Sequence, residues 1–205
     1  MLTYNNLNMK NKVICIGEIL YDCFFIKSDF NESSFFQLSC YPGGAPANVA
    51  VGLARLNLKS SFVGVIGNDV LGEKIKKYFE NEGVDISNTI ISKNKNTSLT
   101  LVNNYSNKKY LSYKGADCEL KLTNKILISI AKTKNMAINS VTLTRNKPIV
   151  LLNAINIAYE NKNKIYFDLN IRMNYVNKNL KNNIIKCIKK STQTFPNIPL
   201  FRIFL

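Results

Sequence analysis

The segment Gly43-Gly44-Ala45-Pro46-Ala47-Asn48-Val49-Ala50 carries most of the information about the fold. Its two adjacent glycines leave the backbone open to close approach by a ligand, because neither has a side chain. Pro46 suits the first turn of a helix, where no backbone donor is needed. The apolar residues Val49, Leu53 and Leu56 then recur at helical spacing. The segment therefore predicts a glycine turn that leads directly into a helix.

Strands and helices alternate around this turn. Short apolar runs, typical of strands buried on both faces of a parallel sheet, occur at 13–17, 61–66 and 164–168. Amphipathic helices are predicted at 47–56, 71–82, 124–132, 148–160 and 180–190. Parallel strands need crossover helices, so this order predicts an α/β fold with a mostly parallel sheet. Ligands are expected at the carboxyl ends of its strands.

The composition fits a folded protein and excludes several kinds of chemistry. Of 205 residues, 46% are hydrophobic, and no apolar run approaches the ~20 residues of a membrane helix. The first eleven residues have no signal-peptide pattern and are expected to be a disordered lead-in. Histidine is absent, which excludes Ser-His, Cys-His and His-metal sites. The five cysteines are odd in number and form no C-x-x-C pair, which argues against a disulfide framework and a zinc site and favours a reducing cytoplasm.

The net charge of +15 raises nucleic acid as a partner, since clustered basic residues neutralise phosphates. Here the charge is nearly all Lys, scattered among Asn as at 161–164 and 177–179, with no basic stripe interleaved with aromatic residues. This pattern indicates a solvated surface rather than a face that binds nucleic acid. Neither nucleic acid nor a membrane is therefore an expected partner.

Two glycine-containing segments could carry chemistry. The amide of Asn48, which both donates and accepts hydrogen bonds, suits sugar hydroxyls close to the Gly43-Gly44 turn. From spacing alone, a tight turn with Asn48 as a local cap is an alternative. Residues 67–72 have the G-x-x-x-x-G spacing of a P-loop, but Glu73-Lys74 follows where Lys-Ser/Thr is required. A Walker A site is therefore excluded.

In order and spacing, seven segments together resemble the PfkB-type, ribokinase-like carbohydrate kinases, in their fructokinase-like form. These segments are residues 13–18 leading to Asp22, 43–56, 65–72, 83–85, 114–117, 140–143 and 168–172. The resemblance implies a ribokinase-like three-layer sandwich whose core spans 12–190, with a small β lid formed by strands at about 23–40 and 97–113. Those lid strands are the expected contact if two copies pair as a homodimer.

The resemblance also implies roles for individual residues. Asp22 would accept hydrogen bonds from sugar hydroxyls, and Gly43, Gly44 and Asn48 would line the same pocket. Asp69 and Asp117 are expected to be structural turn residues. Ala45 stands where ribokinases usually carry Lys, which favours fructose as the sugar.

A second group of residues would face the phosphate side of the cleft. By resemblance, this group is Asp168, Asn170 and Arg172, at the carboxyl end of a strand. A strand-end salt bridge and cap is the alternative for these three residues. No residue is predicted to bind a metal ion directly.

The chain contains no match to the later Gly-Ala-Gly-Asp motif, from which family members take the catalytic base and the amides that stabilise the transferred phosphoryl group. No catalytic residue is therefore predicted. ATP and Mg²⁺ are the cofactors that the intact family implies, but their binding by this chain is not expected. Residues 191–205 are predicted to be an aberrant tail, as a frameshift or truncation would produce, so the carboxyl-terminal half of the fold is missing.

Three readings of the function follow. The first is a sugar kinase by family that transfers phosphate from ATP to a sugar hydroxyl, with this chain catalytically incomplete. The second is a non-catalytic sugar-binding or scaffolding protein, and the third, which is not expected, is a basic nucleic-acid binder whose association with DNA depends steeply on salt. Within the first, ribokinase, nucleoside kinase and keto-deoxy-gluconate kinase specificities stay open beside fructose.

Overall fold

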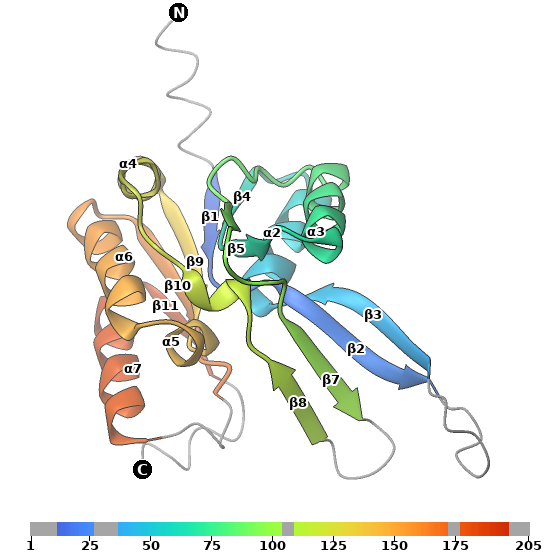
Figure 1. The fold of residues 1–205 in the computed structure, drawn as a ribbon. Helices are drawn as coiled ribbons and strands as arrows, with labels where there is room; N and C mark the ends of the chain where they lie inside the picture. The colour runs from blue at the N-terminus through green and yellow to red at the C-terminus, as the bar shows by residue number, and fades with distance from the viewer. Residues whose placement is uncertain (1–11, 27–36, 104–108, 172–176, 197–205) are drawn as a thin grey trace, which may run out of the picture.

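A five-stranded parallel sheet forms the centre of the molecule (Figure 1). The computed structural model describes residues 12–26, 37–103, 109–171 and 177–196. Every strand pair in this sheet is parallel, and the order is β11-β10-β9-β1-β4. The strands are β1 (Val13–Ile16), β4 (Ser60–Val63), β9 (Asn135–Asn139), β10 (Lys164–Asp168) and β11 (Gln193–Phe195). The predicted α/β class is confirmed.

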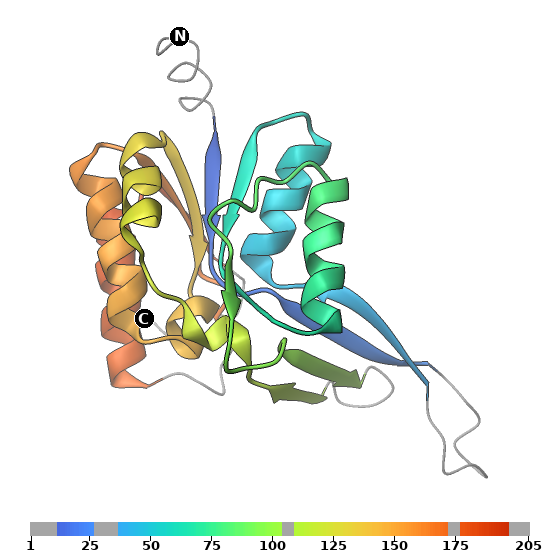
Figure 2. The ribbon, with the colours of Figure 1, turned by 45° about the horizontal axis from the view of Figure 1, so that its top comes forward.

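Helices lie on both sides of this sheet (Figure 2). One side has α2 (Ala45–Arg55) and α3 (Val70–Asn81), and the other has α4 (Asn124–Lys132), α5 (Val141–Arg145), α6 (Pro148–Glu160) and α7 (Lys178–Lys190). The alternation of side chains along β1 explains both layers. Ile14 and Ile16 pack into the apolar cluster with α4, α6 and α7, whereas Cys15 packs into the cluster with α2 and α3. Burial of the two faces holds the three layers together.

Four further strands form a second sheet that projects from one end of the central sheet (Figure 1). Its order is β3-β2-β7-β8, and its strands are β2 (Leu20–Ile26), β3 (Gln37–Gly43), β7 (Leu99–Asn103) and β8 (Lys109–Tyr113). We call this sheet the lid. Tyr41, Tyr110, Leu111 and Tyr113 of the lid are more than half exposed. The homodimer through these strands stays a prediction.

The lid contains a disulfide that the cysteine pattern did not indicate. The antiparallel register of β2 and β3 places Cys23 directly opposite Cys40, and the structure joins the two residues. Spacing along the chain does not show which cysteines will face each other across a hairpin, so the argument against disulfides was wrong for this pair. Cys15, Cys118 and Cys187 are free thiols.

Two predicted boundaries also differ from the structure. The strand expected at 61–66 is divided at Gly64, because β5 (Val65–Gly67) leaves the central sheet and pairs with β6 (Ile90–Ser92). The core was expected to end at residue 190, yet β11 pairs in parallel with β10 at Tyr166↔Gln193, Phe167↔Thr194 and Asp168↔Phe195. The described start of the predicted tail is therefore part of the central sheet.

None of the described helices combines the length and apolar character that crossing a membrane requires.

Candidate functional site

The Gly43-Gly44 turn lies directly against Asp22. Pairing of β2 with β3 places Leu20 opposite Gly43 and Asp22 opposite Tyr41. A Cβ atom at Gly43 would overlap the Asp22 carboxyl group. The missing side chain thus leaves room for a carboxylate at the point where the lid meets the central sheet. The predicted proximity of Asp22 to the glycine pair is present in the structure.

Glycine is needed at position 44 for a different reason, the conformation of the backbone. Its φ of 107° lies in a region that residues with a side chain rarely adopt, and a Cβ there would overlap the backbone of Glu18. The backbone N–H of Asn48 donates to the Gly44 oxygen at 2.9 Å, which closes the first turn of α2. The side chain of Asn48 is exposed. Asn48 is therefore available to a ligand, and the turn that precedes it is fixed.

Glu18 is a buried carboxylate that anchors this turn, and no sequence pattern assigned it a role. It follows β1 and is 2% exposed. Its Oε1 accepts hydrogen bonds from the Ala45 backbone N–H at 3.2 Å and from Asn139 Nδ2 at 2.8 Å. Its Oε2 lies 2.8 Å from the hydroxyl of Thr142, which can donate to it. Glu18 thereby links the start of α2 to the carboxyl end of β9 and to α5.

Burial raises the pKa of Glu18, because removal from water disfavours the charged form more than its hydrogen bonds stabilise it. The folded chain therefore keeps this proton at pH values where the unfolded chain has released it. The contribution of Glu18 to the stability of the folded chain is fully present below its ordinary pKa of 4.5. This contribution is lost as the pH rises through the pKa that Glu18 has in the folded state.

Glu18→Gln keeps the shape of the side chain and removes this titration. We expect the free energy of unfolding of the wild type, relative to Glu18→Gln, to fall as the pH rises from about 4.5 towards neutrality. Urea unfolding of both proteins over this range measures the difference. A difference in the free energy of unfolding between the two proteins that stays constant with pH would contradict the raised pKa of Glu18.

The phosphate-side residues lie at the end of β10. Asp168 is its last residue, and its Oδ1 accepts a hydrogen bond from the backbone N–H of Asn170 at 3.1 Å. Asn170 has a positive φ of 22°, so the chain turns sharply there. The predicted cap at this strand end is therefore present between Asp168 and Asn170. Arg172 lies outside the described residues.

An apolar hollow of about 650 Å³ contains one of the predicted site residues, Asp168, beside the start of α2. Its lining includes Asp168 and Asn139 from the strands, and Ala45 and Pro46 from the start of α2. The other predicted residues, Asp22, Gly43, Gly44, Asn48 and Asn170, are not in this lining. Asp168 and the first turn of α2 thus share one hollow, whereas Asp22 is on strand β2 of the lid, against Gly43.

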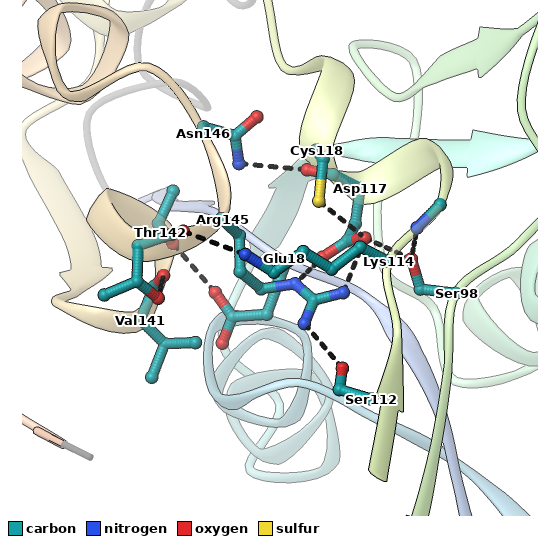
Figure 3. Close-up of polar contacts among 12 residues, drawn as sticks. Glu18, Ser98, Ser112, Lys114, Asp117, Cys118, Val141, Thr142, Arg145 and Asn146 are labelled. Carbon is teal, nitrogen blue, oxygen red and sulfur yellow. Dashed lines mark hydrogen bonds and ion pairs between the residues drawn. The ribbon is translucent and has the colours of Figure 1, made fainter. Parts of the chain in front are cut away.

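A buried ion pair stabilises the junction between the lid and the helices (Figure 3). Arg145 of α5 forms an ion pair with Asp117, and their side chains are 7% and 0% exposed. Arg145 Nη2 donates to Asp117 Oδ1 at 2.9 Å, and Nη1 donates to the Ser112 hydroxyl of β8 at 3.0 Å. Ser98 also donates to Asp117. Figure 3 shows Glu18 and Thr142 beside Arg145, so this cluster continues into the Glu18 contacts.

Asp69 has a comparable structural role. Its carboxylate caps α3 by accepting from the Gly72 N–H at 2.8 Å, and it also accepts from the Thr97 N–H at 2.6 Å. Burial opposes ionisation of Asp69, but these donors outweigh it and lower the pKa of the carboxyl group. Asp69 and Asp117 therefore have the structural roles predicted for them.

The described residues do not fit a complete Mg²⁺ site. Among them, no three His, Cys, Asp or Glu side chains gather closely enough to hold a metal ion. Within the lining of the hollow, Asp168 supplies a carboxylate, whereas the Asn139 amide is already hydrogen-bonded to Glu18 and Thr142. Mg²⁺ is usually held by one or two carboxylates together with phosphates of the substrate. Asp168 by itself would therefore supply only part of such a Mg²⁺ site.

Comparison with known proteins gives the family. A family model described as pfkB family carbohydrate kinase matches residues 10–204. A 5-dehydro-2-deoxygluconokinase of Clostridium beijerinckii is 34% identical over 171 residues, which cover 80% of this chain and 50% of that protein. A 5-dehydro-2-deoxygluconokinase of Mesomycoplasma hyopneumoniae is 34% identical over 168 residues, which cover 78% of this chain and 48% of that protein. The chain thus spans about half the length of these curated relatives.

Solved structures support the same assignment. An uncharacterized sugar kinase of Pyrococcus horikoshii is 28% identical, with a TM-score of 0.78 over 89% of this chain and 62% of that one. The fold is shared with a fructokinase of Xylella fastidiosa solved with bound ATP, at a TM-score of 0.80 and 23% identity over 90% of this chain and 57% of that one. The chain therefore belongs to the pfkB family of carbohydrate kinases.

Proposed function

We propose that this chain provides the sugar-binding part of an ATP-dependent sugar kinase. The observation that carries the proposal is the Asp22 carboxylate held against Gly43, together with the exposed side chain of Asn48 in the first turn of α2. A carboxylate accepts hydrogen bonds from sugar hydroxyls, and an amide both donates and accepts them. The Asp22 carboxylate and the Asn48 amide would bind and orient the sugar.

Phosphoryl transfer requires groups that these residues do not supply. ATP bound with Mg²⁺ would provide the phosphoryl group, and Asp168 would contribute one carboxylate on that side of the hollow. The 205 residues contain no Gly-Ala-Gly-Asp sequence. We therefore expect the isolated chain to bind sugar without phosphorylating it.

The proposed sugar is 5-dehydro-2-deoxygluconate. The names of relatives that are 31–34% identical support this choice. Fructose, favoured by Ala45, is supported by solved fructokinases of only 23–24% identity. The two compounds share hydroxyl groups that Asp22 and Asn48 would recognise, so they are alternatives for one pocket.

Isothermal titration calorimetry with 5-dehydro-2-deoxygluconate, fructose and ribose tests this proposal. We expect the first to bind more tightly than the other two. Tighter binding of fructose would support the proposed sugar pocket but contradict 5-dehydro-2-deoxygluconate as its sugar. Absence of binding by all three would contradict the proposed function itself.

A further inference from the structure

The disulfide of the lid lies next to the proposed sugar-binding carboxylate. Cys23 directly follows Asp22 on β2, and Cys40 is paired opposite Cys23 on β3. Further along β3, Gly43 pairs with Leu20 and leaves the space that the Asp22 carboxyl group fills. The covalent bond thus joins the same two strands whose register places Asp22 against Gly43.

Strand β3 is the outer strand of the lid beside β2 (Figure 1). Among the described strands, β2 is its only partner. Of the seven residues of β3, only Gly43 at its end is buried. An edge strand that buries so little apolar surface gains little stability from packing. The disulfide is therefore a main restraint on the position of β3.

Strand β2, in contrast, is held by other contacts. Its residues 21–24 pair with 99–102 of β7 on the side away from β3. Tyr21 and Cys23 also belong to the buried apolar cluster with α2 and α3. Opening the disulfide would leave β2 in place and release β3, the strand that leads into Gly43.

The two bonded cysteines differ in their access to a soluble thiol. Cys40 is an exposed residue, whereas Cys23 is 2% exposed. In thiol–disulfide exchange a thiolate attacks one sulfur of the bond, and the rate depends on which sulfur is accessible. We therefore expect attack at Cys40 Sγ.

A dithiol reductant would complete the exchange in two steps. Its first thiolate bonds to Cys40 Sγ, the bond between the two cysteine sulfurs breaks, and the Cys23 sulfur leaves as a thiolate and takes up a proton. The second thiolate of the reductant then attacks the reductant's own sulfur in this mixed disulfide, and the Cys40 sulfur leaves and is protonated in turn. Two electrons pass from the dithiol to the two cysteines, and the reductant departs as a disulfide. A disulfide oxidant reverses the reaction.

The other cysteines do not compete with this pair. Cys15 and Cys187 are fully buried, and burial raises the pKa of each thiol to about 12. Burial also raises the pKa of Cys118. A thiol with a raised pKa carries little of the reactive thiolate at neutral pH. Cys23 and Cys40 are thus the pair through which a thiol reagent would act.

We propose that the Cys23–Cys40 disulfide is a thiol-exchange site that controls sugar binding by fixing β3. The oxidised chain holds Gly43 against Asp22, and the reduced chain leaves β3 free to separate from β2. The reduced chain then binds sugar only in the fraction of molecules in which β3 is paired, which weakens the apparent affinity in proportion. This inference rests on the proposed sugar pocket and adds to it a control that follows the thiol redox state of the surroundings.

The test compares the full chain after treatment with oxidised dithiothreitol and after reduction with dithiothreitol. Alkylation in denaturant followed by mass spectrometry should find three free cysteines in the oxidised chain and five in the reduced chain. Hydrogen exchange should become faster in β3 after reduction and stay unchanged in β1. Calorimetry with 5-dehydro-2-deoxygluconate and fructose should give about 3- to 10-fold weaker binding after reduction, as expected if β3 stays paired in about a tenth to a third of the reduced molecules.

Two variants show whether the effect comes from this bond. Cys40→Ser removes the bond at its exposed residue, so its sugar affinity and its β3 exchange should match those of the reduced chain with or without reductant. Cys118→Ser is the matched control, because Cys118 is a free thiol outside the lid pair. This variant should keep the full response of the wild type to reduction.

Five free cysteines after oxidation, or equal sugar affinity of the oxidised and reduced chains, would overturn the proposal. So would an effect of the reductant that persists in Cys40→Ser. Exchange in β3 is measured without sugar, so the two inferences can be told apart. Absence of sugar binding by both forms contradicts the proposed function, whereas β3 exchange that does not respond to reduction contradicts control by the disulfide.

Discussion

Arg145→Met is expected to lower the free energy of unfolding by about 3–5 kcal/mol, the range seen when one partner of a buried ion pair is removed. The substitution would leave the Asp117 carboxylate, which is 0% exposed, without its cation. It would also remove the hydrogen bond from Arg145 to Ser112 of the lid. The loss is large because a buried charge without a partner keeps the cost of leaving water and loses its compensation.

Urea unfolding of the two proteins measures this loss, and the chain offers a matched control. Arg55 also pairs with a carboxylate, Glu82, but its side chain is 63% exposed. Exposed pairs contribute little because solvent screens them, so Arg55→Met should change stability far less than Arg145→Met. If Arg145→Met costs no more than Arg55→Met, the ion pair does not hold the lid junction together.

Asp22→Ala is expected to weaken sugar binding by about 10- to 100-fold, since a hydrogen bond to a charged group contributes about 1.5–3 kcal/mol. Gly43→Ala tests the same carboxylate without removing it. The added methyl group would overlap the Asp22 carboxyl group and force it to move. We therefore expect Gly43→Ala to weaken sugar binding in the same direction. Titration calorimetry measures both effects.

Gly52→Ala is the control for this pair. Gly52 is inside α2, and apart from the adjacent helix backbone no atom lies within 4 Å of a Cβ there. Alanine there should leave sugar binding unchanged and increase stability by about 0.5–1 kcal/mol. Wild-type sugar affinity in both Asp22→Ala and Gly43→Ala would show that the pocket is elsewhere.

Much of the fold could be predicted from periodicity. Helices α4 and α6 and strand β10 have the predicted bounds, because each has an uninterrupted apolar pattern. Strand β9 was missed, since Met136, Ala137 and Ile138 are too short a run to distinguish from a helix or loop. Strand β11 was missed because Gln193–Phe195 has one large apolar residue and forms only through pairing with β10.

The candidate site could be predicted in part. Asp22 and Gly43 were placed together by resemblance, and the register of β2 and β3 does bring them together. Glu18 and Arg145 were missed because charged residues are expected at the surface, and their burial depends on partners far away in the sequence. Glu18 contacts Asn139 and Thr142, more than a hundred residues later. A carboxylate directly after a buried strand was the available signal for Glu18.

We propose that these 205 residues bind a sugar and do not by themselves transfer a phosphoryl group to it. Calorimetry on one preparation, titrated with 5-dehydro-2-deoxygluconate and fructose and then with ATP and Mg²⁺, tests it most directly. We predict heat of binding for at least one of the sugars, none for the nucleotide, and no phosphorylated product. Nucleotide binding without sugar binding, or ATP-dependent phosphorylation by the pure chain, would contradict the claim.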